Sequence, residues 1–294
     1  DVDVTTSPDI GSFSALDLAD GTYVVPVSGL DYDTTYTWTI EVDDGTHLTT
    51  KVATFTTEQM LLVDSTFDDS TDSADLRANS GGQDWYESRN DVPSLLYLDE
   101  TDVAGNSGKK AGFTESTSGN AYLTQEFGEA QTGIFAVEWD IYIDTIMTAS
   151  PYRAGMMLIG DDTFAGNGPN ADNSERSVYM GFYKSGGGDT GTMDLVARDS
   201  DDGWTSFTTV AAGLNLDQWY TIKVVCDLTA DTYDVYVDGV YQATIGARNA
   251  KTEVTAISFA QWNDGAGAFY VDDVYQVTET AYELTMAVDP TEGG

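Results

Sequence analysis

The sequence predicts an all-β protein whose larger part is a sandwich of two antiparallel sheets. Short alternating runs of strand length recur along the chain, and turns rich in Gly and Asp separate them. No long stretch carries the 3.6-residue period of a helix. The clearest run is residues 219–240, WYTIKVVCDLTADTYDVYVDGV, where two alternating strands flank the turn 227–231. A tight Asp238-Gly239 turn then leads into a third strand.

Residues 1–58 form a first, small β unit. Its strand-like runs are Val24–Val27, Gly29–Ile40 and Ala53–Thr57. Leu30, Tyr36 and Trp38, followed by a closing TFTT, resemble the second half of a fibronectin type III module. The resemblance implies that Tyr36 makes a corner hydrogen bond and that Trp38 lies in a core. Because the first two strands of that family have no counterpart, we expect a partial sandwich with an open edge.

Residues 59–279 form the second and larger unit. A long polar loop, residues 64–120, is expected near its start and should wrap one face. Short strands without helices between them favour two packed antiparallel sheets. The strand-like runs are Met60–Val63, Tyr122–Phe127, Phe135–Ile143, Ala154–Ile159, Ser177–Lys184, Met193–Arg198, Thr205–Val210, Trp219–Asp227, Thr232–Val237, Tyr241–Ile245, Ala256–Gln261 and Ala268–Val277.

The hairpin at 219–240 also carries a resemblance to a fold family. A W-Y-x-hydrophobic strand followed by YDVYVDG is similar to the laminin G-like members of the concanavalin-like jelly rolls. This resemblance implies an antiparallel jelly roll for residues 59–279. The tail, residues 280–294, contains YELTMAVDPTEGG and is similar to the opening strand of internalin-type B-repeats. The chain therefore resembles a slice of a longer surface protein.

The net charge restricts the classes of partner and the environment that we expect for this protein. With 50 acidic and 12 basic residues, the net charge is −38, which repels nucleic acid and anionic lipid. No apolar run reaches the length of a membrane span. An extracellular, secreted or cell-surface location is expected, where salt or divalent cations screen the charge. The single cysteine, Cys226, falls on the apolar face of its strand and is expected in the core.

Acidic residues at both ends of the larger unit suggest calcium. Related jelly-roll modules begin with a D-x-F-[DE] run and end with F-Y-[IV]-D-D-V, and their first and last strands pair. By resemblance, this chain would hold a structural calcium ion there, since calcium takes six to eight oxygen ligands. The residues expected at that site are Asp64, Asp68, Asp69, Asp272 and Asp273. A weaker candidate cluster contains Asp161, Asp162 and Asp172.

One strand raises the question of catalysis. Glu138, Asp140 and Tyr142 share one face of a strand. Family 16 glycoside hydrolases of this architecture place two glutamates on such a strand, but here Tyr142 stands at the second position, so a two-carboxylate mechanism lacks a partner. Polysaccharide lyases of the same fold use His, Tyr, Arg and Gln, and the larger unit has no His and few Arg, which argues against this class. An exposed acidic strand is therefore favoured over a catalytic one.

Aromatic residues outside the core alternation are candidates for stacking on sugar rings. Those proposed as ligand-binding are Trp85, Tyr86, Tyr179, Tyr183, Trp204 and Trp262, with Tyr152 as a further candidate. Tyr179 and Tyr183 flank Gly181, which predicts an open spot where a flat ligand could approach. Each aromatic taken alone is more often a packing residue.

The sequence therefore favours a noncatalytic, calcium-stabilised extracellular module for adhesion, surface architecture or carbohydrate binding, with a glycan or other surface proteins as partners. One alternative is a polysaccharide-degrading lyase or glycoside hydrolase of the same fold. Another is a subunit of an extracellular filament or sheath, assembled when an open sheet edge accepts a strand from a neighbouring copy.

Overall fold

The structure is a computed structural model of residues 1–294. It describes residues 1–19, 21–28, 30–31, 34–57, 66–78, 85–89, 91–147, 152–163, 168–170, 172–184, 186, 189–199 and 206–276. The described residues belong to two compact units, which we call unit 1 (within residues 1–60) and unit 2 (within residues 61–277). The boundaries predicted near residues 58 and 279 fall in stretches outside the described residues.

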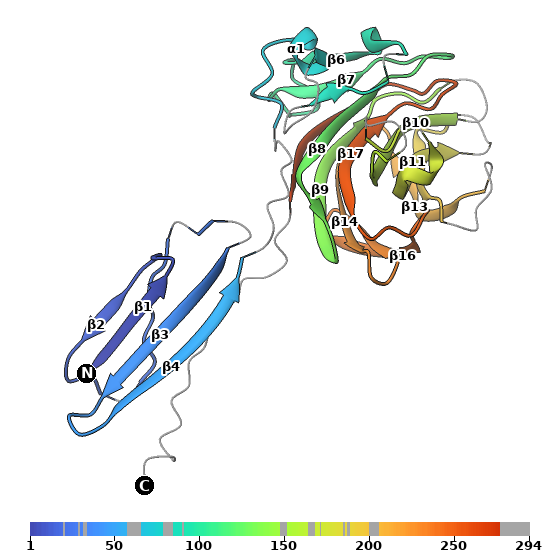
Figure 1. The fold of residues 1–294 in the computed structure, drawn as a ribbon. Helices are drawn as coiled ribbons and strands as arrows, with labels where there is room; N and C mark the ends of the chain where they lie inside the picture. The colour runs from blue at the N-terminus through green and yellow to red at the C-terminus, as the bar shows by residue number, and fades with distance from the viewer. Residues whose placement is uncertain are drawn as a thin grey trace. The chain divides into compact units, whose positions relative to one another are not determined.

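Unit 1 contains a four-stranded antiparallel sheet in the order β2-β1-β3-β4 (Figure 1). Its strands are β1 (Val2–Ser7), β2 (Phe13–Ala15), β3 (Thr35–Asp43) and β4 (Leu48–Thr56). Tyr36 and Trp38 alternate along β3 and are buried, and Tyr36 stacks on Phe55 with ring centroids 5.4 Å apart. The Tyr36 hydroxyl accepts a hydrogen bond of 2.8 Å from the backbone N–H of Asp31, which is the bond that the resemblance implied.

One prediction for unit 1 is wrong, and two of its strands were not predicted. The run Val24–Val27 is not a strand: Val24 is 82% exposed, so its apolar side chains have no face to pack against. Conversely, β1 and β2 were not predicted, because VDVTTS and FSA are short and mostly polar. The edge strand β4 leaves Leu48 and Val52 exposed, at 63% and 62%. The fibronectin-like assignment stays a prediction.

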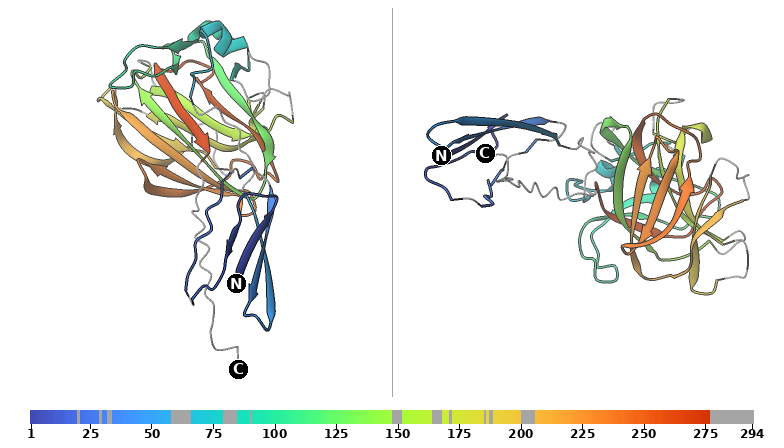
Figure 2. Two further views of the ribbon diagram at one scale, coloured as in Figure 1. Left: turned by 90° about the vertical axis from the view of Figure 1, so that its left-hand side faces the viewer. Right: turned by 90° about the horizontal axis from the view of Figure 1, so that it is seen from below.

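Unit 2 is the predicted sandwich of two large antiparallel sheets, visible in Figures 1 and 2. The first sheet has the order β13-β12-β11-β10-β17-β8-β5, and the second β16-β15-β14-β9-β18-β7-β6. The strands of the first sheet are β5 (Tyr86–Glu87), β8 (Tyr122–Gln131), β10 (Tyr152–Gly160), β11 (Arg176–Lys184), β12 (Thr192–Ala197), β13 (Thr208–Asn215) and β17 (Val254–Ala260). Those of the second are β6 (Leu96–Asp99), β7 (Lys110–Phe113), β9 (Ile134–Ile143), β14 (Trp219–Asp227), β15 (Thr232–Val237), β16 (Val240–Gly246) and β18 (Phe269–Gln276).

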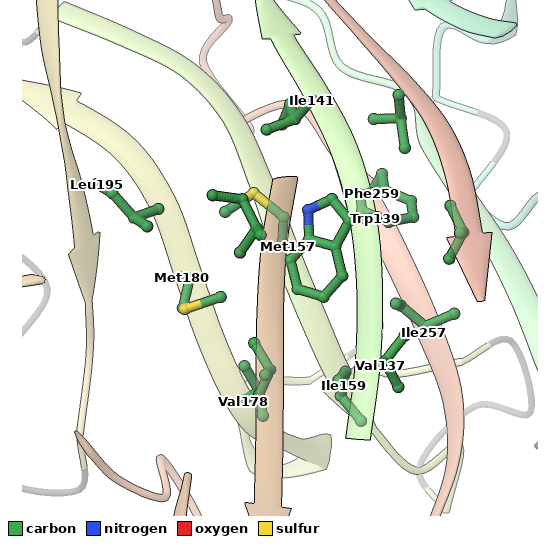
Figure 3. Close-up of a cluster of buried hydrophobic side chains, with 14 of the residues drawn as sticks. Val137, Trp139, Ile141, Met157, Ile159, Val178, Met180, Leu195, Ile257 and Phe259 are labelled. Carbon is green, nitrogen blue, oxygen red and sulfur yellow. The ribbon is translucent and has the colours of Figure 1, made fainter. Parts of the chain in front are cut away.

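The core lies between the two sheets. Every second residue of a strand turns inward, so one hydrophobic set from each sheet is removed from water. Trp139 of β9 is fully buried and meets Phe259 of β17 edge-on, with ring centroids 5.6 Å apart. Figure 3 shows Trp139 among Met157, Ile159 and other apolar side chains of the first sheet. Each sheet therefore has one inner face and one outer face.

The hairpin at 219–240 forms as predicted, and β14 and β15 have the predicted bounds. Asp231 and Asp238 adopt positive φ values of 54° and 50° in its two turns, a conformation that Asp tolerates better than most residues. Cys226 lies in the core, and burial raises the pKa of its thiol. Its side chain therefore acts as a small apolar core residue, as predicted.

The stretch predicted as a long loop, residues 64–120, is more structured than expected. It contains the helix α1 (Ser73–Ala78), β5, a single 3-10 turn η1 (Pro93–Leu95), β6 and β7. Phe67, Trp85 and Leu96 anchor this stretch in the core, which is why it folds onto the sheets. None of the helices within the described residues is long and apolar enough to cross a membrane.

Candidate functional site

The candidate site lies on the outer face of the first sheet, turned away from the core. On β11, Val178, Met180 and Phe182 pack into the core, so alternation turns Tyr179 and Tyr183 to the outer face. There a second hydrophobic cluster forms. It contains Tyr122, Met156, Leu158, Tyr179, Ala260, Trp262 and Ala266, with Tyr183 and Phe207 packed against it. An aromatic surface on the outside of a sandwich does not serve the main core.

Trp262 covers the position that the sequence predicted to be open. Its Cζ2 atom lies 2.9 Å from where a Cβ on Gly181 would stand. The absence of a side chain at Gly181 makes room for the indole ring, so the space there is not free for a ligand, and that prediction is wrong. The Trp262 ring lies 5.9 Å from Tyr183 and 5.7 Å from Phe207, measured between centroids. The rings are tilted against one another, and Phe207 meets Trp262 edge-on at 79°, so together they form an aromatic group and not a flat platform.

Beside these rings is a cavity of about 490 Å³, which we call the pocket. Its volume is in the range of sites that hold small-molecule ligands. The residues that line it are Arg89, Tyr122, Arg153, Met156, Asn170, Asp172, Asn173, Arg176, Tyr179, Tyr183, Arg198, Phe207, Trp262, Asn263 and Asp264. Tyr183 and Phe207 are partly exposed, so their rings are accessible.

Two buried arginines lie over the ring of Tyr179. The guanidinium carbons of Arg176 and Arg198 are 5.0 Å and 4.9 Å from its centroid, and Arg198 is also 4.5 Å from the centroid of Phe207. Arg176 Nε donates to the carbonyl oxygen of Pro169 at 3.1 Å. Burial raises the pKa of Tyr179, and the two positive charges offset part of this rise. Tyr179 is therefore a neutral phenol that supports two cations.

Arg89 and Arg153 bring two further cations to the pocket. The Arg89 guanidinium lies 4.7 Å over Tyr122, and its Nη1 donates to the Tyr122 hydroxyl at 3.1 Å and to Asn263 Oδ1 at 3.2 Å. The Tyr122 hydroxyl donates to the same Asn263 oxygen at 2.9 Å. Arg153 lies 5.7 Å over Trp262. Four of the six arginines of the chain thus line one cavity, each stacked on an aromatic ring.

The two carboxylates of the pocket are held in their ionised form. Asp264 accepts a hydrogen bond from Arg153, which lowers its pKa. Asp172 caps the 3-10 turn η2 (Asn173–Glu175), and the backbone N–H of Ser174 lowers its pKa. Since both pKa values are lowered, neither carboxyl group is suited to donate a proton near neutral pH.

A polar network fixes one wall of the pocket. Asn170 Nδ2 donates to the hydroxyl groups of Ser88 at 2.6 Å and Thr124 at 2.9 Å, both on the outer side of the first sheet. Ser258 shares this network, 2.6 Å from Thr124 between hydroxyl oxygens. These buried bonds tie the stretch 168–170 to the sheet, so the wall is in place before a ligand binds.

The predicted cluster of Asp161, Asp162 and Asp172 does not come together as a metal site. Asp161 pairs with Lys251, with 2.7 Å between Oδ2 and Nζ, and both side chains are largely buried. Asp172 is engaged as a helix cap. The charge of Asp162 lies instead near Glu126, where it helps burial to raise the pKa of that group. Among the described residues, no three acidic, His or Cys side chains converge to hold a metal ion.

The predicted ligand-binding aromatics divide into two groups. Tyr179, Tyr183 and Trp262 line the pocket. Trp85, Tyr86 and Tyr152 do not. Trp85 is buried in the main core against Phe67 and Phe259, so it is not available to a ligand. Tyr86 is also buried, and its hydroxyl donates to Glu126. Trp204 lies outside the described residues, and Tyr152 packs beside the main core.

The acidic strand β9 is on the other sheet. Glu138 and Asp140 turn to the outer face of the second sheet, where Glu138 accepts from Tyr275 at 2.7 Å and Asp140 from Thr221 at 2.6 Å. Burial raises the pKa of Asp140. The Tyr142 hydroxyl donates to Asp217 at 3.4 Å, and its ring packs beside Trp219. None of these three predicted alternatives lines the pocket.

Two lysines lie beside the carboxylates in the region where calcium was expected. Lys109 Nζ donates to the backbone oxygens of Asp68 at 2.9 Å and Ser70 at 2.7 Å. Lys110 is fully buried, and its Nζ donates to the backbone oxygens of Thr101 and Gly108, both at 2.7 Å. These ammonium groups take up carbonyl oxygens that a metal ion would need.

The acids of that region are otherwise engaged. Asp272 accepts from Asn106 at 2.7 Å, and the charge of Asp68 adds to burial in raising the pKa of Asp273. Asp69 is exposed. Asp64 and the predicted pairing of the opening strand lie outside the described residues. The calcium site predicted from Asp64, Asp68, Asp69, Asp272 and Asp273 therefore stays a prediction.

The sequence interpretation missed the arginines of the pocket. Arg176 and Arg198 stand at or just beyond strand ends, and Arg89 and Arg153 are far apart in sequence. One signal was available in the sequence. The chain has only 12 basic residues, yet Arg176 and Arg198 lie at the two ends of the segment that contains β11 and β12. Their convergence depends on β10 lying between β11 and β17, an order that the local pattern does not reveal.

No protein-family model matches the chain, and no curated protein matches it. Among solved structures it is similar to a sialidase, with 12% identity over 84% of this chain and a TM-score of 0.49, and it spans 21% of that sialidase chain. It is also similar to the carbohydrate binding module CBM66 from Bacillus subtilis, with 13% identity, 68% and 98% of the two chains covered and a TM-score of 0.38. A GH131 beta-glucanase catalytic domain from Podospora anserina matches with 13% identity, 75% and 96% coverage and a TM-score of 0.45. Similarities at this level do not decide the function, so the case for a ligand rests on the pocket.

Proposed function

We propose that unit 2 is an extracellular carbohydrate-binding module that holds a glycan in the pocket without cleaving it. The observation that carries this proposal is the group of aromatic rings at the pocket, in which Tyr183 and Phe207 are partly exposed and the buried Trp262 supports them, next to fixed polar groups. Sugar rings stack on aromatic faces through their C–H groups, and their hydroxyl groups need hydrogen-bond partners. Asn170 and Asn263 supply amide groups in the same lining.

The state of the pocket carboxylates favours binding over hydrolysis. Glycoside hydrolysis uses one carboxylic acid with a raised pKa and a second carboxylate. Here Asp172 and Asp264 both have lowered pKa values and both are engaged, in a helix cap and in an ion pair. The acidic strand with Glu138 is on the other sheet. A hydrolase at this pocket would lack its proton donor.

The proposal is tested by glycan binding to variants of the aromatic group. Trp262→Ala and Tyr183→Ala should each weaken binding at least about tenfold, because the first removes the ring that supports the stacking surface and the second removes part of that surface. Tyr241→Ala is the matched control, since Tyr241 is an exposed tyrosine on β16 of the second sheet. Isothermal titration and affinity electrophoresis on a panel of soluble polysaccharides provide the measurement. Equal binding by all three variants and the parent chain would overturn the assignment.

Catalysis is tested on the same panel. The proposal expects neither new reducing ends nor an unsaturated, ultraviolet-absorbing product after long incubation. Turnover abolished by Glu138→Gln would establish a hydrolase on the second sheet. Formation of an unsaturated product that Tyr122→Phe abolishes would establish a lyase at the pocket, since Tyr122 is the phenol bonded to Arg89 and Asn263.

For unit 1 we propose self-assembly by strand addition to a second copy of this chain. The observation that favours it is the edge strand β4, on which Leu48 and Val52 are more than half exposed. Light scattering at increasing concentration should show association that Val52→Lys reduces, because a charge on an edge strand opposes pairing. A strict monomer at high concentration would refute this second proposal.

A further inference from the structure

The lining of the pocket is rich in positive charge, although the molecule as a whole is strongly acidic. The chain as a whole carries a net charge of −38, yet the lining contains four arginines and two aspartates. A surface selected only for solubility would have no reason to gather scarce cations in one cavity. The concentration of arginine at an aromatic pocket therefore points to a specific partner of negative charge.

The arginines are arranged to present donors. A guanidinium that stacks on a ring uses its flat face, and this leaves the N–H groups at its edge for hydrogen bonds in its plane. The guanidinium carbons of the four pocket arginines lie 4.7–5.7 Å over aromatic ring centroids. Part of their N–H groups already bond the protein, as Arg89 does with Asn263 and Arg153 with Asp264, and a ligand would share or replace these partners. The edge of a guanidinium matches the two oxygens of a carboxylate or sulfate group. Stacking also limits side-chain motion, so less entropy is lost on binding.

The positive charge is only partly balanced by the protein. Arg153 pairs with Asp264, and Arg89 with Asp91 at 3.4 Å. Arg176 is 7% exposed and forms no ion pair within 4.0 Å in the described part of the chain, although the charge of Asp172 lies near enough to interact with it. A buried cation without a direct counter-charge is costly, and an anion placed beside it relieves that cost. Asp264, in contrast, is 70% exposed and could turn to solvent when a ligand anion competes for Arg153.

The remaining features restrict the kind of anion. A dense polyanion such as nucleic acid would bring many charges near a strongly acidic surface and be repelled. A sugar with one acidic group per ring brings its charge into the cavity and its C–H face to the partly exposed rings of Tyr183 and Phe207. We infer that the pocket selects acidic saccharides, in which a carboxylate or sulfate group binds the stacked arginines. This inference rests on the proposed carbohydrate binding and names its substrate class.

The test uses pairs of polysaccharides that differ in charge alone. Polygalacturonate is compared with its methyl ester, and a lightly sulfated dextran with dextran, at one fixed ionic strength. The acidic member of at least one pair should bind at least about tenfold more tightly. The two pairs also separate carboxylate from sulfate as the recognised group.

Charge variants locate the recognition. Arg89→Met and Arg176→Met should each weaken binding of the acidic member about tenfold and leave the neutral member unchanged, and Arg→Lys at either position should restore part of the affinity. Lys223→Met is the control, since it removes the same charge from β14 of the second sheet. Circular dichroism and the melting temperature establish that each variant folds, and the Lys variants keep the test valid if a Met variant does not.

Each outcome decides one of the two claims. Equal binding of the acidic and neutral members, lost in Trp262→Ala, would overturn the charge inference and leave carbohydrate binding intact. Acidic saccharides that bind the two Met variants as tightly as the parent chain would also overturn it. Binding to no member of either pair, or to any polysaccharide of the panel, would overturn the proposed function itself.

Discussion

The contact between Gly181 and Trp262 permits a test of the pocket by a single methyl group. In Gly181→Ala the new Cβ would lie 2.9 Å from Trp262 Cζ2, whereas ordinary contacts are 3.4–4 Å. It would also lie 3.2 Å from the backbone oxygen of Gly155 on the neighbouring strand, so the backbone side offers little relief. The indole ring therefore has to move by about half an ångström or more, away from the sheet.

The loss in free energy of unfolding caused by Gly181→Ala can be estimated from similar substitutions. Adding a methyl group to a packed cluster typically costs about 1–3 kcal/mol. For a unit of this size, about 2 kcal/mol corresponds to a fall in melting temperature of about 4–8 °C. The displaced ring also changes its contacts with Tyr183 and Phe207, so glycan affinity should fall as well.

Thermal unfolding and tryptophan fluorescence measure both effects. Gly186→Ala is the matched control, because a Cβ at Gly186 would meet nothing within 4 Å, and its melting temperature should stay within about 2 °C of the parent. A Gly181→Ala protein with unchanged melting temperature and unchanged glycan affinity would refute the packing of Trp262 over this glycine.

Three further predictions concern charge. Lys110→Met should lower the free energy of unfolding by about 3 kcal/mol in urea titrations, because the carbonyl oxygens of Thr101 and Gly108 lose a charged donor. The control is Lys51→Met on the exposed strand β4, which should change the free energy of unfolding little. The free energy of unfolding should rise as pH falls from neutral towards the usual pKa range of Asp. Burial raises the folded-state pKa values of Asp140, Asp272 and Asp273, so the folded state takes up protons at higher pH than the unfolded chain. Below the usual range of Asp the trend should reverse, since the lowered pKa values of Asp172 and Asp264 make stability fall as they are protonated; a steady loss from pH 7 downwards would contradict this. Calcium and magnesium at equal concentration should raise the melting temperature of EDTA-treated protein equally, by screening alone, and a gain specific to calcium would instead support an ion bound with Asp64.

The local alternation of apolar and polar residues was sufficient to predict the fold class and part of the candidate site. The period of two at 219–240 predicted β14, β15 and the buried Cys226, because a strand between a core and solvent must alternate. The same period placed Tyr179 and Tyr183 on one face. Such inferences need only neighbours in sequence.

The local sequence pattern could not predict contacts between segments that are distant in sequence. From the sequence, Trp85 was predicted to be an accessible aromatic in a polar loop, but in the structure it is buried in the core against Phe259 of β17. Arg89 and Asn263 lie 174 residues apart and meet through a hydrogen bond. The lysines that take up the carbonyl oxygens near Asp68 likewise become visible only once β7 is placed beside β18.

The stacked arginines also have a consequence for the rate at which a ligand arrives. An acidic saccharide approaching from a distance meets the field of the whole chain, with its charge of −38, before it meets the four arginines. Added salt weakens the long-range repulsion first, since its range shrinks to about 10 Å at 0.1 M, while contacts inside the cavity are screened much less. Association should therefore accelerate as ionic strength rises from low values, opposite to the usual behaviour of a cationic site with an anionic ligand. Such a site would work best in saline surroundings and capture little in dilute ones.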